Sequence, residues 1–242
     1  MKKITFFACP KPFIGETAIH QSNAITSWMT IPNIDVILLG NECGVSDFAK
    51  KIHAKHIPEI SYNQYGTPLL DNIFAKAVEH TSSEFLCFIN SDIIFFSNFR
   101  KAADSVISDS KEFLMVGRRR TVKITFNIDF SSNWEASLKE KAKNSPLDSY
   151  TAIDYFLYPK GFLFIDKPFA VGRAAYDNWI LWSVRQKKVA KLIDATHDIT
   201  AIHQKHDYQH VSTGINNSWE GIESDENRRL AGGYRCMCNI LD

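Results

Sequence analysis

Residues 85–96 read FLCFINSDIIFF, an apolar run that is interrupted only by Asn90, Ser91 and Asp92. Such a run, rich in aromatic and β-branched residues, is typical of a strand that is buried on both faces of a sheet. Because an unpaired charge is costly to bury, we expect Asp92 to mark the point where the strand emerges at the sheet edge. The alternative is a polar turn between two short strands. In open α/β sheets, ligands bind at the carboxyl edge of the strands.

The chain before this run alternates between strand and helix patterns. Three buried strands are predicted at residues 4–9, at 34–39 and near Ile60, and three helices at 16–29, at 46–53 with Ser46 as its cap, and at 69–80 after Pro68. Short connections between strands that are apolar on both faces favour a parallel sheet. The predicted fold class is therefore α/β, with a mostly parallel central sheet and helices on both faces.

The pattern after residue 96 is less regular. Helices are predicted at 99–107, 134–143 and 177–186, and strands at 113–116 and 189–194. Residues 155–165 predict a hairpin or a strand that bends at Pro159–Gly161. Neither a repeat nor a linker interrupts the chain, so we expect a single domain over residues 1–242.

Composition excludes several classes of protein. The 242 residues carry a formal net charge of +1, which favours neither nucleic acid nor an anionic membrane as a partner. No apolar run approaches the roughly 18 residues that span a bilayer, and the first residues are too short a stretch for a signal peptide. The five cysteines lack the spacing of a disulfide framework, which favours the cytoplasm. P-loop and dinucleotide-binding fingerprints are absent from the sequence.

Two segments together resemble a known family. Residues 66–72 read GTPLLDN and open a predicted helix, and the strand that follows ends in Asn90-Ser91-Asp92. This arrangement resembles the nucleotide-sugar half of family-2-type glycosyltransferases with the GT-A fold, in which the strand ends in a D-x-D motif. Asn90 stands at the first acidic position of that motif. The resemblance implies a GT-A-like domain whose residues 1–97 bind the nucleotide sugar and whose residues 98–242 form the acceptor side and a C-terminal tail.

The resemblance also implies a donor site and a metal. The donor would be a UDP- or GDP-type sugar, held by Cys9, Lys11, Asn41, Asn72, Asn90, Ser91 and Asp92. Mn²⁺ or Mg²⁺ would offset the charge of the leaving diphosphate, and such ions need only one or two protein carboxylates. Asp92 is the expected carboxylate ligand. His203, which follows the strand-like ITAI, is the expected histidine ligand, with His206 as the second choice.

A second segment resembles the acceptor side of these enzymes. Gly172-Arg173 predicts a turn, and Asp177 follows at a predicted helix start, where the helix dipole favours an ionised carboxylate. The resemblance assigns Asp177 as the general base, and a helix N-cap is the alternative. The residues expected to contact the donor or acceptor sugar are Asp154, Arg173, Asn178 and Trp179. Trp179 alternatively belongs to the core.

These observations predict an enzyme that transfers a sugar, with metal assistance and inversion, to the hydroxyl of a glycan, lipid-linked or protein acceptor. The enzyme would be cytoplasmic, and peripheral to a membrane if the acceptor is lipid-linked. One alternative is a metal-dependent hydrolase that uses His203, His206 and His210. Another is a non-catalytic module that binds nucleotides or sugars. Arg118–Arg120 form a basic run that suits either phosphate contact or a solvated surface.

Overall fold

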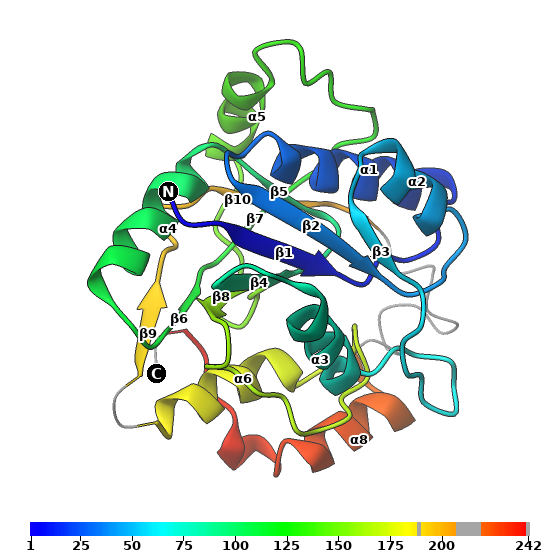
Figure 1. The fold of residues 1–242 in the computed structure, drawn as a ribbon, viewed down its shortest axis with the longest axis vertical. Helices are drawn as coiled ribbons and strands as arrows, with labels where there is room; N and C mark the ends of the chain where they lie inside the picture. The colour runs from blue at the N-terminus through cyan, green and yellow to red at the C-terminus, as the bar shows by residue number, and fades with distance from the viewer. Residues whose placement is uncertain (188–189, 207–218, 241–242) are drawn as a thin grey trace.

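A computed structural model describes residues 1–187, 190–206 and 219–240. Its main sheet has seven strands in the order β3-β2-β1-β4-β8-β6-β9 (Figure 1). β8 runs antiparallel to β4 and β6, and the other neighbouring strands pair in parallel. The strands are β1 (Ile4–Ala8), β2 (Ile34–Leu39), β3 (Lys55–Ile57), β4 (Phe85–Ile89), β6 (Phe113–Val116), β8 (Tyr155–Pro159) and β9 (Lys191–Asp194). The predicted α/β class and mostly parallel sheet are confirmed.

Helices cover both faces of this sheet and enclose two apolar cores. Helices α1 (Gly15–Met29) and α2 (Val45–Lys51) lie on one face, and α3 (Leu70–His80), α6 (Tyr176–Arg185) and α8 (Ile222–Leu230) lie on the other (Figure 1). α4 (Asn98–Asp109) and α5 (Trp134–Lys143) add apolar residues to the first core. A short 3₁₀ helix, η1 (Tyr234–Cys236), follows α8.

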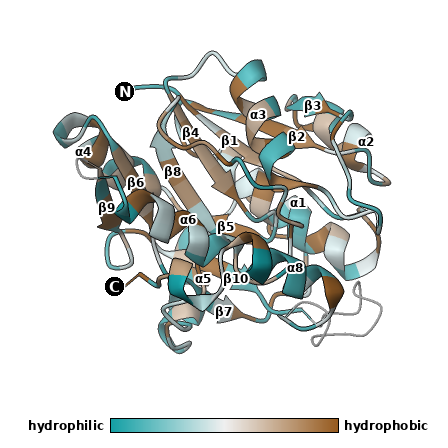
Figure 2. Cartoon of the chain, turned by 90° about the horizontal axis from the view of Figure 1, so that it is seen from below, coloured by the Kyte–Doolittle hydropathy of each residue, from teal (hydrophilic) through white to brown (hydrophobic). Residues whose placement is uncertain are grey.

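Alternation along the strands divides their side chains between these two cores. Phe6 and Cys87 point into the first core, whereas their sequence neighbours Phe7 and Phe88 point into the second. Successive side chains of a strand face opposite sides of the sheet, so a strand covered on both faces must be apolar throughout. Figure 2 shows this apolar character along the central strands. The same burial explains why residues 85–89 carry no polar residue.

A second, three-stranded sheet brings distant segments beside the 90–92 turn. It has the order β5-β10-β7, with β5 (Ile93–Phe95), β10 (Ala201–Gln204) and β7 (Arg120–Val122). Residues 85–96 thus form β4, a turn at 90–92 and β5, so the turn and the sheet edge coincide. β10 is antiparallel to β5 and parallel to β7, and this register sets His203 beside Ile93 and Thr121. His203 is thereby brought next to Asp92, which lies 111 residues earlier in the chain.

Some local expectations were wrong. Ser46 does not cap α2, because the N-cap is Gly44 at a φ of 82°. A Cβ at position 44 would lie 2.8 Å from Cβ of Phe13, so the close approach and the positive φ both require glycine. The strand expected near Ile60 lies earlier, in β3. Within the described ranges, none of the helices is both long and apolar enough to cross a membrane.

Candidate functional site

A cavity of about 420 Å³ opens at the carboxyl edge of the main sheet, beside the turn that follows β4. The cavity collects charged and aromatic side chains from segments that are far apart in the sequence. Its lining includes Lys11, Asn90, Asp92, Arg119, Asp148, Asp154, Arg173, Tyr176, Asp177, His203, His206 and Trp219. This is the edge at which α/β sheets bind ligands.

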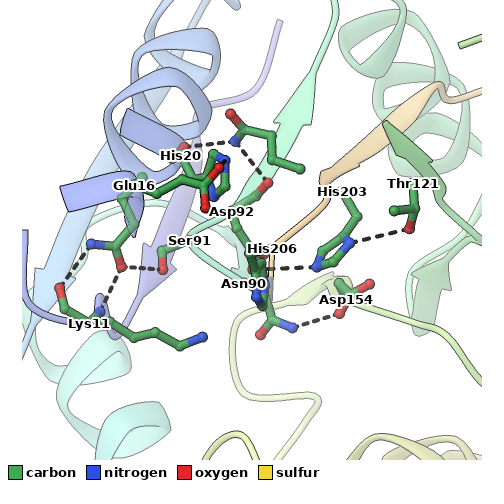
Figure 3. Close-up of polar contacts among 12 residues, drawn as sticks. Lys11, Glu16, His20, Asn90, Ser91, Asp92, Thr121, Asp154, His203 and His206 are labelled. Carbon is green, nitrogen blue, oxygen red and sulfur yellow. Dashed lines mark hydrogen bonds and ion pairs between the residues drawn. The ribbon is translucent and has the colours of Figure 1, made fainter. Parts of the chain in front are cut away.

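Asp92, His203 and His206 converge on one point of this cavity (Figure 3). His206 Nε2 lies 3.1 Å from Asp92 Oδ2, and His203 Nε2 lies 3.6 Å from the same oxygen. One ligand atom from each of the three residues falls within 4.8 Å of the other two. Two imidazoles and a carboxylate in this arrangement suit a divalent transition metal.

The electrostatics of Asp92 fit a cation. Burial alone would raise its pKa, but His203, His206 and Lys11 together hold the pKa of this carboxyl well below its usual range. Its second oxygen, Oδ1, is buried and has no hydrogen-bond partner among the described residues. A buried carboxylate oxygen without a partner is costly, and a bound cation would remove that cost. Asp92, His203 and His206 are therefore the residues that fit Mn²⁺ or Mg²⁺.

Asn90, at the other end of the Asn90-Ser91-Asp92 triplet, has a different environment from Asp92. Asn90 Nδ2 donates a 2.6 Å hydrogen bond to Asp154 Oδ1, and the Asn90 backbone N–H donates to the carbonyl of Asp154. Asp154 Oδ2 accepts from Arg119, whose Nε donates to Asp148. Burial opposes the charge of Arg119, but Asp154 and Asp148 raise its pKa. An aspartate at position 90 would face Asp154 at hydrogen-bond distance, which accounts for the amide there.

Lys11 and Ser91 are held at the cavity by Gln21. Gln21 accepts from the Lys11 backbone N–H and from the Ser91 hydroxyl, and it donates to the Lys11 carbonyl. The Lys11 ammonium has no hydrogen bond or ion pair with any residue that the structure describes. Burial lowers its pKa, while nearby Asp92 opposes that shift. Its backbone is thus fixed, and its side chain is available to an anionic ligand.

Asp177 also lines the cavity, at the start of α6. Burial raises the pKa of Asp177 to about 7, against the hydrogen bond that it accepts from the Asn178 N–H. The expected ionising effect of the helix start is therefore outweighed by burial. Asp177 is not the N-cap, which is Ala175 at a φ of 85°. A non-glycine residue in that region is strained, and such strain clusters at functional sites.

Arg173 also reaches this cavity, but its guanidinium is paired. It donates twice to Glu223 Oε2, at 2.9 and 2.7 Å, and Glu223 Oε1 accepts from Asn63. The pair joins the Gly172-Arg173 turn to α8. Arg173 is thus placed at the predicted site by a partner that the sequence pattern did not indicate.

Several predicted residues lie outside the main cavity. Cys9 lines a smaller cavity of about 90 Å³, which it shares with Lys11 and Asp92, and burial raises the pKa of its thiol to about 12. Asn72 accepts from the Ser61 N–H, and the Asn41 N–H reaches the Tyr62 hydroxyl. Two residues that were predicted to contact a sugar have structural partners instead. Asn178 donates to the Cys238 carbonyl, and Trp179 is buried against Phe169.

The basic run has structural partners. Arg118 and Arg120 donate to backbone carbonyls of Asp148 and Ser145, and Arg119 pairs with two carboxylates. The structure therefore presents the run neither as a free phosphate-binding patch nor as a solvated surface. His210, the third histidine of the expected cluster, lies outside the described residues.

Sequence reasoning missed other residues of the site. Gln21, Thr121, Asp148, Trp219 and Glu223 all line the cavity or contact residues that do. None lies in a recognisable motif, and only tertiary contacts bring them to the site. Trp219 is the exposed aromatic residue of the cavity, with half of its surface accessible.

No protein-family model matches the chain, and no curated protein matches its sequence significantly. Solved structures do match its fold. S. aureus TarS 1-349 aligns with a TM-score of 0.56 at 12% identity, over 84% of this chain and 60% of that one. TarS 1-349 in complex with UDP-GlcNAc gives a TM-score of 0.54 at 11% identity, over 94% and 70%.

A third structure is glucosyl-3-phosphoglycerate synthase from Mycobacterium tuberculosis in complex with Mn²⁺, UDP and glucosyl-3-phosphoglycerate. It aligns with a TM-score of 0.52 at 13% identity, over 86% of this chain and 74% of that one. The chain thus spans less than two thirds of the first TarS structure. At these identities the likeness concerns the fold, and this chain has the GT-A-type fold of these glycosyltransferases.

Proposed function

We propose that the protein is a metal-dependent glycosyltransferase that moves a sugar from a UDP- or GDP-type donor to an acceptor hydroxyl. The observation that carries this proposal is the convergence of Asp92, His203 and His206 in a cavity at the carboxyl edge of a GT-A-type sheet. Support also comes from the similar folds that were crystallised with UDP-GlcNAc, or with Mn²⁺ and UDP. Residues 1–97 would serve the donor and residues 98–242 the acceptor.

On the donor side, Asp92, His203 and His206 would hold Mn²⁺ or Mg²⁺. The bound ion would offset the negative charge that develops on the nucleoside diphosphate as the glycosidic bond breaks. Lys11 would supply a second positive charge, because its ammonium has no hydrogen bond or ion pair with any described residue and lines the cavity beside Asp92. The Ser91 hydroxyl and the smaller cavity beside Cys9 would bound the nucleotide on the β1 side.

On the acceptor side, Asp177 would act as the general base. The acceptor oxygen attacks the anomeric carbon, its proton passes to an Asp177 carboxylate oxygen, and the bond from that carbon to the diphosphate breaks on the opposite face. The sugar configuration is therefore inverted. A pKa of about 7 suits a base that must accept a proton near neutral pH. Asp154, held by Asn90 and Arg119, would orient the sugar hydroxyls between the two sides.

The acceptor would be a glycan, a lipid-linked saccharide or a protein hydroxyl. Trp219 offers an exposed ring at the cavity for a sugar to stack on. We place the enzyme in the biosynthesis of glycans, and in the cytoplasm because its five cysteines lack the spacing of a disulfide framework. Peripheral attachment to a membrane would follow if the acceptor is lipid-linked.

A panel of nucleotides tests this function. The melting temperature of the protein would be measured with UDP, GDP, CMP and dTDP, each with and without Mn²⁺. We expect UDP or GDP to raise Tm, and to do so more strongly with the metal, because a ligand that binds only the folded state stabilises it. Release of nucleoside diphosphate from a matching sugar donor should then depend on an added acceptor.

The outcomes separate the alternatives. No response to any nucleotide would contradict a glycosyltransferase, and stabilisation by zinc alone would favour the hydrolase. Nucleotide binding without turnover on any acceptor would favour the non-catalytic module.

A further inference from the structure

A chain of hydrogen bonds extends behind the proposed metal site. Thr121 Oγ1 lies 3.2 Å from His203 Nδ1, and the Thr121 hydroxyl donates to Asp148 Oδ2 at 2.7 Å. The first contact follows from the parallel pairing of β7 and β10, in which Thr121 and His203 are register partners. Figure 3 shows that Thr121 and Asp92 approach His203 from opposite sides.

The number of available hydrogens fixes the direction of this chain. A carboxylate without a proton only accepts hydrogen bonds, and a threonine hydroxyl has a single hydrogen to donate. Asp148 Oδ2 also accepts a 2.9 Å hydrogen bond from Arg119 Nε, with which it forms an ion pair. The Thr121 hydrogen is therefore committed to Asp148, and its oxygen must accept a hydrogen bond from His203 Nδ1–H.

We propose that Thr121 and Asp148 are positioning residues that turn the Nε2 lone pair of His203 toward Asp92 and thereby set the metal affinity of the site. This inference rests on the proposed function. With its proton on Nδ1, His203 presents an acceptor to Asp92 Oδ2 across 3.6 Å. Two acceptors that face each other at this distance repel, and a cation between them would remove that repulsion. Partners of this kind, behind metal-binding histidines, orient the ring and raise its basicity.

This chain of hydrogen bonds from His203 through Thr121 to Asp148, here called the relay, also continues to Asn90 at the other end of the Asn90-Ser91-Asp92 triplet. Asp148 joins Arg119, Arg119 joins Asp154, and Asp154 accepts from Asn90. The hydrogen-bonded path therefore runs from Asn90 in the 90–92 turn to His203, whose Nε2 faces Asp92 Oδ2 at 3.6 Å. An ion at Asp92 and a sugar at Asp154 would thus be held by one network. Disturbing Thr121 should weaken metal binding first, because Thr121 contacts the histidine directly.

The test is Mn²⁺ affinity, measured by the electron paramagnetic resonance signal of free Mn²⁺ at saturating UDP. Thr121→Val keeps the shape of the side chain and removes the hydroxyl, so we expect Mn²⁺ affinity to fall by about 10–100-fold. Thr121→Ser keeps the hydroxyl and should restore affinity to within a few-fold of the wild type. UDP affinity without metal should be the same in all three proteins.

Thr5→Val is the matched control. Thr5 is a buried strand threonine whose hydroxyl bonds Thr81 and Ser83, away from the cavity. Its replacement should lower Tm and leave Mn²⁺ affinity unchanged. A purely structural role for Thr121 would instead lower Tm in Thr121→Val with wild-type Mn²⁺ affinity, and this result would overturn the relay.

Nitrogen-15 NMR of the wild-type ring provides a test that needs no variant to fold. With Mg²⁺ and UDP bound, His203 should carry its proton on Nδ1. A proton on Nε2 would overturn the relay, as would Thr121→Ser binding Mn²⁺ as weakly as Thr121→Val. A wild-type protein that binds neither UDP nor Mn²⁺ would overturn the proposed function, and the relay with it. A wild type that binds both, alongside an equally competent Thr121→Val, would overturn the relay alone.

Discussion

Two carboxylates line the same cavity, and their surroundings shift their pKa values in opposite directions. Around Asp92, two imidazoles and the Lys11 ammonium outweigh burial and hold the pKa well below its usual range. Around Asp177, burial dominates and raises the pKa to about 7, with Asp154 adding to the shift. Both carboxylates lie at the ends of regular elements, one after β4 and the other at the start of α6.

The difference shows how the surroundings of two carboxylates suit them to different chemical roles. A carboxylate that stays ionised suits a cation, and one that exchanges a proton near pH 7 suits a general base. Pairs of titratable groups whose surroundings push their pKa values apart are a recurring sign of such a division. The helix start does not decide the state of Asp177, because the backbone N–H contacts to its carboxylate do not offset its burial.

Removing the first carboxylate should have the largest effect. Asp92→Asn leaves two imidazoles facing an amide, so Mn²⁺ binding and sugar transfer should both be lost. Transfer should fall by about 1,000-fold, the scale of losing a main electrostatic group in catalysis. The measurements are Mn²⁺ titration calorimetry and initial rates. Asp35→Asn, which breaks only a surface ion pair with Lys3, should retain both properties.

Removing the second carboxylate should affect chemistry and spare the metal. Asp177→Asn should lower kcat by about 100–1,000-fold, because the amide accepts no proton from the acceptor. Donor affinity and Mn²⁺ affinity should stay at wild-type values, measured by calorimetry. Loss of Mn²⁺ binding in this variant would contradict the separation of the two regions. Asp47→Asn, on the exposed side of α2, is the control.

The rate should also depend on pH through Asp177. Its base form is the ionised carboxylate, so kcat/KM should fall about tenfold per pH unit below a pKa of about 7 and level off above it. In Asp177→Asn the residual rate should lose this dependence. A profile that is flat between pH 5 and 8 in the wild type would contradict the assignment.

Stability should vary with pH in the corresponding sense. The pKa of Asp177 is higher in the folded chain than in the unfolded chain, so its protonated form favours folding at low pH. That contribution is lost as the pH rises through about 7. Asp177→Asn should therefore stabilise the protein at pH 8 by about 1–2 kcal/mol and have little effect at pH 4. Urea denaturation at the two pH values measures this change.

A substitution at Asn90, the first position of the triplet, should change stability more than turnover. Asn90→Asp places a carboxylate beside Asp154 Oδ1, which should lower the free energy of unfolding by about 1–3 kcal/mol. Asn90→Asp with Asp154→Asn exchanges amide and carboxylate across the same contact and should recover at least half of the loss. A double variant no more stable than Asn90→Asp would show that the Asn90–Asp154 contact does not decide the residue at position 90.

The sequence predicted most of the first half of the fold. Residues 4–9, 34–39 and 85–89 are continuous apolar runs, and their burial on both faces follows from that pattern alone. Asp92 was found because it is the charge at the end of such a run. The family resemblance pointed to His203 because it follows the strand-like ITAI, and β10 brings it beside Asp92.

The remainder of the site depends on contacts between distant segments. Arg119 meets Asp148 and Asp154 across 29 and 35 residues, and Arg173 meets Glu223 across 50. No local pattern encodes these pairings. Trp179 shows the same limit, because its place on the inner face of α6 depends on Phe169 from another segment. The pKa of Asp177 depends on its burial by the folded chain.

The most direct test is the position of Mn²⁺ in crystals grown with Mn²⁺ and UDP, located by anomalous scattering. We predict a single strong peak within about 2.0–2.3 Å of an Asp92 carboxylate oxygen and of Nε2 in His203 and His206. In crystals of Asp92→Asn the peak should be absent. Bound UDP with Mn²⁺ elsewhere, or with no Mn²⁺ beside Asp92, would contradict the account.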